Sequence, residues 1–366
     1  MRDSVSMLMK DSDNTRTIEA DGGTSINSLV FLEDGRHFLS GGEDGTIRRW
    51  RVEDGKEIQD QRLTASGAVR AIALSGDGNW IVSTGWPVTT VWNRSTRQIA
   101  RTMSEHTNWV NAVDVSPDST KLATGSDDGK AIIWNLLNGE RIRPGLPHDN
   151  AVASVKFSPN GDRLAVAVWL RALHVYSAQT GHLLKTIAVG VYRSDSVAWS
   201  SNSQYIFALA SGNVLRHIDV DANTGFLSEW TIPGEPGGNW STIALPRNGK
   251  FIAAFVGLSL TFWDTSTGAQ IGDVLENSQV PRLRSMALSS VNNYVATASD
   301  NGVITLRNLN GILPMSYRYV GQPQAACSVE LHPQIGALRD ILRALELHCG
   351  TFLYNPVRIQ VKSNPT

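Results

Sequence analysis

The sequence predicts an all-β fold, a seven-bladed β-propeller of four-stranded antiparallel blades, followed by a short C-terminal α-helical tail. Two observations predict the propeller. A pattern of an apolar strand, a polar turn and a second strand ending in an aromatic residue recurs at intervals of 42 to 45 residues. The chain is also rich in glycine (32) and tryptophan (11), as expected of tight turns between strands that carry bulky anchors. A period in the low forties with four short strands per unit is typical of propeller blades.

The clearest copies of the repeat are residues 38–50 and 122–134. Both contain an apolar strand, a turn rich in Gly and Asp, and a strand that ends in tryptophan. Trp92 lies 42 residues from the tryptophan of each copy. Continuing this spacing, the seven blade repeats are expected to end near Trp50, Trp92, Trp134, Tyr176, Ile218, Trp263 and Arg307.

A second alternating run precedes each of these strands and is expected to form a further strand of its blade. Residues 110–115 precede the turn at residues 116–118, and residues 152–157 precede the turn at residues 158–161. Alternation with period two indicates strands, and Pro, Asp, Asn and Gly supply the turns. The other runs begin near Ile26, Val69, Ser196, Thr242 and Arg284. The propeller is therefore expected to span residues 14–311.

These repeats resemble those of the WD-repeat family over about residues 15–310, most specifically in the first, third and sixth copies. In that family a third-strand tryptophan, a second-strand Ser or Thr, a turn aspartate and a histidine before the first strand form a buried hydrogen-bonded tetrad. The third copy has all four residues of this structural tetrad: His106, Thr124, Asp128 and Trp134. In the first copy Gly22 stands where the histidine belongs. The fourth keeps His148 but has Tyr176 for the tryptophan and Leu170 for the aspartate.

The resemblance also implies how the ring closes, since in this family an N-terminal strand usually completes the last blade. Residues 15–19 are well placed to do so beside the seventh copy. Residues 316–320 also alternate and follow the seventh copy directly, so they compete for the same edge. Closure matters because an open sheet edge invites aggregation, and the N-terminal strand is the favoured candidate.

Residues 312–366 form a C-terminal extension in which the repeat stops. Its residues 333–348 predict an amphipathic helix, because Ile335, Leu338 and Ile341 fall at helical spacing. In one interpretation the apolar face of this helix packs on the propeller, and in a second it binds a partner. A third interpretation leaves the extension poorly ordered.

Composition excludes several classes of protein. Lys and Arg (33) nearly balance Asp and Glu (34), which leaves no electrostatic footprint for nucleic acid or an anionic membrane. No run approaches the roughly 18 apolar residues of a membrane helix, and residues 1–10 lack the apolar core of a secretory signal. Cys327 and Cys349 provide no disulfide framework for the repeats. We expect a cytoplasmic or nuclear protein, monomeric or part of a larger complex, with no nucleic-acid or membrane partner.

The sequence contains no recognisable catalytic pattern. It has no HExxH, no GxxxxGK[ST] and no GxSxG motif. The acidic pairs at residues 43–44 and 127–128 recur at one place in the repeat, as structural turn residues do. We therefore expect no enzymatic activity, no cofactor and no metal.

The loops at one end of the blades are the expected partner site. We call this end the loop face; it carries the turns between the second and third strands and the loops that join successive blades. Aromatic and arginine residues are over-represented among interface hot spots. The partner-binding residues predicted on the loop face are Trp86, Trp109, Trp169, Trp240, Arg70, Asn111, Asp127, Arg282 and Arg284. The alternative role for any single tryptophan is to plug the channel or cover a neighbouring blade.

The function implied by the resemblance is that of a non-catalytic scaffold or adaptor that binds a peptide or protein partner on the loop face. An alternative is the substrate-receptor subunit of a ubiquitin ligase. Such receptors often carry an arginine three residues after the third-strand tryptophan, where this chain has Glu53, Ser95, Leu137 and Ser266. A propeller-fold enzyme is a less favoured alternative, because it requires carboxylates or metal ligands converging at the channel mouth.

Overall fold

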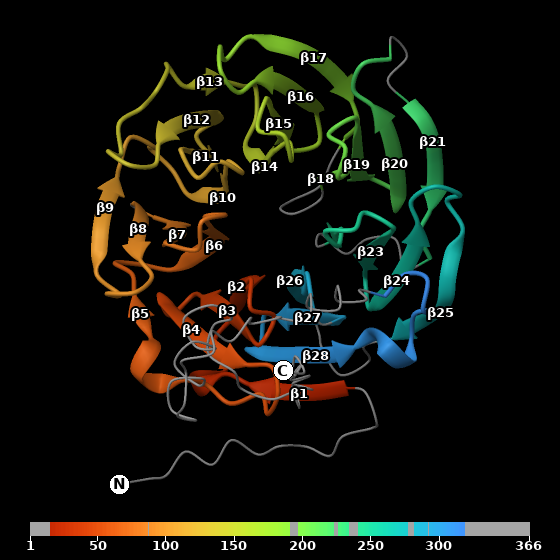
Figure 1. The fold of residues 1–366 in the computed structure, drawn as a ribbon. Helices are drawn as coiled ribbons and strands as arrows, with labels where there is room; N and C mark the ends of the chain where they lie inside the picture. Colours follow the sequence, from red (N-terminus) through yellow and green to blue (C-terminus); the bar gives the residue numbers. More distant parts are fainter. Residues whose placement is uncertain are drawn as a thin grey trace, which may run out of the picture. The chain divides into compact units, whose positions relative to one another are not determined.

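The computed structural model describes residues 15–86, 88–190, 197–222, 226–233, 241–276, 282–291 and 293–318. These residues contain seven four-stranded antiparallel sheets, which stand side by side around a common axis (Figure 1). The predicted all-β, seven-bladed propeller is therefore confirmed. Within the part of the chain that is described, no helix is long and apolar enough to cross a membrane.

Each of the first six blades runs from its innermost to its outermost strand in chain order. Blades 1 and 2 consist of β2 (Ile26–Phe31), β3 (His37–Gly42), β4 (Thr46–Arg51), β5 (Leu63–Thr64), β6 (Val69–Leu74), β7 (Trp80–Gly85), β8 (Thr89–Asn93) and β9 (Ile99–Met103). Blades 3 and 4 consist of β10 (Val110–Val115), β11 (Lys121–Ser126), β12 (Lys130–Asn135), β13 (Leu146–Pro147), β14 (Val152–Phe157), β15 (Arg163–Val168), β16 (Ala172–Ser177) and β17 (Leu183–Ala188). Blades 5 and 6 consist of β18 (Val197–Trp199), β19 (Tyr205–Ala210), β20 (Val214–Asp219), β21 (Phe226–Thr231), β22 (Ser241–Ala244), β23 (Phe251–Val256), β24 (Ser259–Asp264) and β25 (Gln270–Glu276).

Blade 7 combines three strands from the end of the repeats with one from their beginning. It consists of β26 (Leu283–Leu288), β27 (Tyr294–Ser299), β28 (Val303–Asn308) and β1 (Thr15–Glu19). Strand β1 pairs antiparallel with β28, with Thr17 opposite Thr305. The predicted closure by the N-terminal strand is confirmed. Of the competing segment, Ser316 to Arg318 lies in a turn and a bend, and residues 319–320 lie outside the described residues.

The second strand of each blade is the most deeply buried, because neighbouring blades cover both of its faces. All six residues of β23 are buried, whereas the outermost strand β9 has a single buried residue, Met103. Close stacking requires glycine at Gly125 in β11, since a Cβ there would lie 2.5 Å from Val152 Cγ1 of the next blade. The blades are also joined by hydrogen bonds, and the Leu29 N–H donates to Ser285 Oγ at 3.0 Å across the closing seam.

Three short 3₁₀ turns complete the described secondary structure: η1 (Asp21–Gly23), η2 (Gln59–Gln61) and η3 (Leu309–Gly311). After η3 the chain returns to blade 6, where Leu313 is buried beside Phe251. The Tyr317 hydroxyl then donates to Asp264 Oδ2 at 2.7 Å. The end of the repeats is therefore anchored on the preceding blade.

The predicted helix at 333–348 lies outside the described residues, as do Cys327 and Cys349. The limits of the propeller and of the extension, 14–311 and 312–366, remain predictions.

Candidate protein-binding site

Blade 3 carries a continuous hydrogen-bonded chain from its interior to the loop face. The Trp134 indole N–H donates to Thr124 Oγ1 at 2.9 Å, and Thr124 Oγ1 lies 2.8 Å from His106 Nε2. His106 Nδ1 lies 2.9 Å from Asp128 Oδ2, which also accepts the Thr107 N–H at 3.0 Å. Burial alone would raise the pKa of Asp128, but the hydrogen bonds from Thr107 and His106 outweigh it and hold this pKa below its usual value. The chain fixes the loop that enters blade 3 against the turn that carries Asp128.

Other blades keep only the tryptophan contact. Trp50 donates to Ser40 Oγ at 2.8 Å, and Trp92 donates to Ser83 Oγ at 2.9 Å. In blade 6 the acceptor for Trp263 is Thr261 of the same strand. A hydroxyl group therefore accepts from the third-strand tryptophan in all three blades. It comes from the second strand in blades 1 and 2 and from the third strand itself in blade 6.

Blade 4 replaces the tetrad by stacked rings, which the sequence analysis did not foresee. The ring centroid of His148 lies 4.9 Å from that of His174 and 5.9 Å from that of Tyr176. Burial, with the neighbouring His174 adding to it, lowers the pKa of His148 to about 4. Leu170 stands in the turn where blade 3 has Asp128, so His148 lacks the carboxylate that the tetrad would supply.

β-bulges position the polar side chains at the loop-face end of the innermost strands. In five blades the register shifts at the second residue of the strand, so that this residue has no single partner opposite it. A bulge re-aims a side chain away from the ladder. The five bulge residues are Asn27, Arg70, Asn111, Ala153 and Arg284. The predicted site residues Arg70, Asn111 and Arg284 thus occupy one equivalent position.

Arg70 joins three blades on the loop face. Its Nη1 donates to Glu43 Oε1 of blade 1 at 2.9 Å, and its guanidinium lies 4.5 Å from the ring centroid of Trp109 in blade 3. Glu43 also accepts a hydrogen bond from Asn27 Nδ2 at 3.1 Å. A guanidinium over a tryptophan face is an attractive cation–π arrangement. The stack leaves Trp109 half-buried.

Blade 7 extends this group. Burial lowers the pKa of Arg284, the charges of Asp300 and Glu43 oppose that change, and the charges of Arg70 and Arg282 add to it. These groups are therefore electrostatic neighbours across the seam between blades 7 and 1. We call Glu43, Arg70, Trp109, Arg282 and Arg284 the loop-face cluster.

Asn111 and Asp127 form a separate contact within blade 3. Asn111 Nδ2 donates to Asp127 Oδ1 at 2.6 Å. Blade 1 repeats the arrangement with Asn27 and Glu43. Because the contact recurs between a bulge residue and the first residue of the following turn, it stabilises that turn.

The remaining predicted tryptophans do not share one environment. Trp86, on the turn after β7, is 41% exposed. Trp169 follows β15, is partly exposed, and its carbonyl accepts from Asn150 Nδ2 at 3.1 Å. Trp240 lies outside the described residues. Glu43 and Asn27 were missed as partners of the cluster, although Asn27 has the same offset in its repeat as Arg70 and Asn111.

Comparison with known proteins agrees with this geometry. The family model "WD domain, G-beta repeat" matches residues 13–51 and 97–135. The "Small ribosomal subunit protein RACK1" of Drosophila melanogaster is 30% identical over an alignment of 244 residues, and the match covers 52% of this chain and 76% of the relative. The chain is a WD-repeat protein. The protein of the same name from Caenorhabditis elegans is 30% identical over 151 residues, 38% of this chain, and the chain spans 46% of that relative's length.

Membership of the WD-repeat family supports a protein-interaction scaffold in general. Among the residues that the structure describes, no group of three or more His, Cys, Asp or Glu side chains is arranged to hold a metal ion.

Proposed function

We propose that this WD-repeat protein is a non-catalytic scaffold that binds a protein partner on its loop face, through the loop-face cluster. The observation that carries the proposal is the contact chain from Glu43 through Arg70 to Trp109, which spans three blades. Bulges hold Arg70 and Arg284, so a partner meets a preorganised surface. Preorganised aromatic and arginine groups contribute strongly to binding because little side-chain entropy is lost.

The chemistry of the cluster favours a partner segment that carries carboxylates beside an apolar side chain. Arg70, Arg282 and Arg284 supply three guanidinium groups against the two nearby carboxylates of Glu43 and Asp300. Guanidinium groups pair with carboxylates in bidentate geometry. The exposed ring of Trp86 provides apolar area on the same face.

A second candidate function is attachment to the small ribosomal subunit. The name that both relatives share favours this candidate. Of the two expected locations, that name supports the cytoplasm and not the nucleus. A role as a ubiquitin-ligase receptor gains no support, since the arginine motif is absent from the sequence.

The test is affinity capture from cell extract with the intact chain and single variants. Trp109→Ala and Arg70→Ala are expected to lose partners that the unmodified chain captures. Trp80→Ala is the matched control, because Arg101 stacks on Trp80 at 5.0 Å at the opposite end of blade 2. If Trp109→Ala retains every partner at full strength while remaining folded, the loop-face proposal is wrong. Co-sedimentation with ribosomal subunits tests the second candidate in the same extracts.

A further inference from the structure

A polar cavity of about 470 Å³ opens between blades 1 and 2 at the end of the blades opposite the loop face. We call it the basal pocket. Its walls come from β4, from the link between the third and fourth strands of blade 1, and from two turns of blade 2. The residues that matter for its chemistry are Arg49, Asp60, Gln61, Gly78, Arg94 and Arg97.

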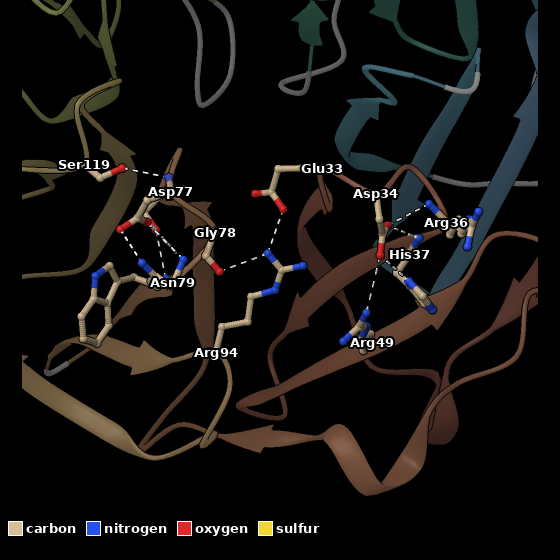
Figure 2. A network of polar contacts seen from close by, with 12 residues as sticks. Glu33, Asp34, Arg36, His37, Arg49, Asp77, Gly78, Asn79, Arg94 and Ser119 are labelled. Atoms are coloured by element: carbon tan, nitrogen blue, oxygen red, sulfur yellow. Dashed lines mark hydrogen bonds and ion pairs between the residues drawn. The ribbon is translucent and has the colours of Figure 1, made fainter. Parts of the chain in front are cut away.

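Two of the three arginines are held in place but keep donors to spare. Figure 2 shows Arg94 between Glu33 and Gly78, to which its Nη1 donates at 2.8 and 3.2 Å. Arg49 Nη1 donates to Gln61 at 2.7 Å. The Nε of Arg49 is buried and has no hydrogen-bond partner within the described residues. The guanidinium groups of Arg49 and Arg94 are therefore fixed at the wall of the cavity.

Two guanidinium groups of the basal pocket, those of Arg49 and Arg94, repel each other. Burial lowers the pKa of Arg49, and the positive charge of Arg94 lowers this pKa further. The carboxylate of Asp34, which lies 3.7 Å from Arg49 Nη2, opposes the decrease. Three guanidinium groups and the carboxylate of Asp60 line the cavity. Outside the lining, the carboxylates of Glu33 and Asp34 lie 2.8 Å from Arg94 and 3.7 Å from Arg49. A bound anion would relieve the repulsion between the arginines.

Arg97 reaches the pocket from a strained backbone. Its φ is 62°, in the left-handed region that favours glycine and strains other residues. Its N–H closes the turn between the third and fourth strands by donating to the carbonyl four residues back. Four other blades have glycine at this position: Gly55, Gly139, Gly181 and Gly268. Blade 2 therefore places a guanidinium where the turn itself favours glycine.

The interface between these two blades also differs from its neighbours. A side chain of the preceding blade covers the equivalent glycine elsewhere, as Arg101 covers Gly139 and Arg143 covers Gly181. Here Arg97 instead extends to blade 1 and donates to the Asp60 carbonyl. The result is an arginine-lined cavity in place of a packed contact.

We propose that the basal pocket binds a phosphate monoester through Arg49, Arg94 and Arg97. Arginine matches phosphate oxygens bidentately, and three guanidinium groups suit a dianion better than a single carboxylate. The cavity is larger than a phosphate group alone and falls within the range of small-ligand sites. It therefore leaves room for the group that the phosphate is attached to. This ligand is independent of the partner on the loop face.

The test is calorimetric titration of the intact chain with inorganic phosphate, a small phosphate ester, and a phosphoserine peptide with its unphosphorylated form. Arg97→Gly restores the residue of the other blades, so it is expected to fold at least as well and to weaken phosphate binding about ten- to a hundredfold. Arg94→Gln is expected to weaken it similarly. Arg171→Gln is the control, because it removes an exposed guanidinium from the loop face.

Tighter binding of the phosphoserine peptide than of the free ester supports the proposal and identifies the source as a phosphorylated partner. Equal binding supports it with a small phosphate ester as the source. The proposal is overturned if no phosphate compound binds at millimolar concentration. It is also overturned if folded Arg97→Gly and Arg94→Gln bind as the unmodified chain does.

Discussion

Thr124→Val is the sharpest test of how blade 3 is held together. The hydroxyl of Thr124 is fully buried and contacts both Trp134 and His106. With His106 Nδ1 donating to Asp128, the Thr124 hydroxyl accepts from Trp134 and donates to His106 Nε2. Valine has nearly the same shape but can do neither. Two buried polar groups are left without partners.

The expected loss of stability follows from the number of buried polar groups left without partners. One buried polar group without a partner costs about 1–3 kcal/mol, so Thr124→Val should lower the free energy of unfolding by about 2–6 kcal/mol. Ser83→Ala is the matched comparison, because it deprives only the Trp92 indole of its acceptor and should cost about 1–3 kcal/mol. Urea unfolding monitored by tryptophan fluorescence gives the unfolding midpoint of each variant. If the dependence of the unfolding free energy on urea concentration is equal in both variants, the two midpoints report their stabilities directly. A Thr124→Val cost no greater than that of Ser83→Ala would refute the reasoning.

Three further predictions concern blades 4 and 6. Leu170 has φ 53° and is 49% exposed, so Leu170→Gly should stabilise the protein by about 0.5–1 kcal/mol in thermal unfolding; a lower melting temperature would contradict this. The pKa of His148 is lowered to about 4, so the unfolded chain binds more protons between pH 6.5 and 4. The His148 contribution to stability should therefore fall by about 2–3 kcal/mol as pH drops through this range. His148→Phe should lessen the pH dependence and leave the part due to His174, whose pKa burial also lowers. Hydrogen bonds from Ser266 and Tyr317 lower the pKa of Asp264 against the effect of burial, so Tyr317→Phe should raise this pKa in an NMR titration; an unchanged value would show that the hydrogen bond does not form in solution.

The architecture could be predicted because its signals are local and repeated. The 42-residue spacing of Trp50, Trp92 and Trp134 follows from one strand position recurring in each blade, and all three side chains are buried. Closure by β1 could be predicted because the resemblance to the WD-repeat family implies a closing N-terminal strand, and residues 15–19 precede the first copy. Neither inference required knowledge of contacts between blades.

Contacts between blades are where sequence reasoning failed. Arg70 and Trp109 were both predicted on the loop face, but their stacking depends on how two blades are rotated against each other. The same holds for Arg97, whose backbone strain is invisible in the sequence because arginine is not excluded from turns. His174 was not predicted because its partner His148 lies in the loop before β14, and both β14 and β15 separate the two residues along the chain.

The complete tetrad lies in the blade that carries Trp109, and the two features are physically connected. Asp128 accepts the Thr107 N–H at 3.0 Å, and the Asp127 N–H donates to the Trp109 carbonyl at 2.9 Å. Both bonds fix the loop that presents the Trp109 ring to Arg70. Blade 4 keeps the equivalent backbone bond, in which the Trp169 N–H donates to the Ala151 carbonyl at 2.9 Å. Leu170 there offers no carboxylate to the loop that enters the blade. The Asp128 carboxylate is therefore the additional anchor of the loop that presents Trp109, while stacking between neighbours keeps the degenerate blades folded.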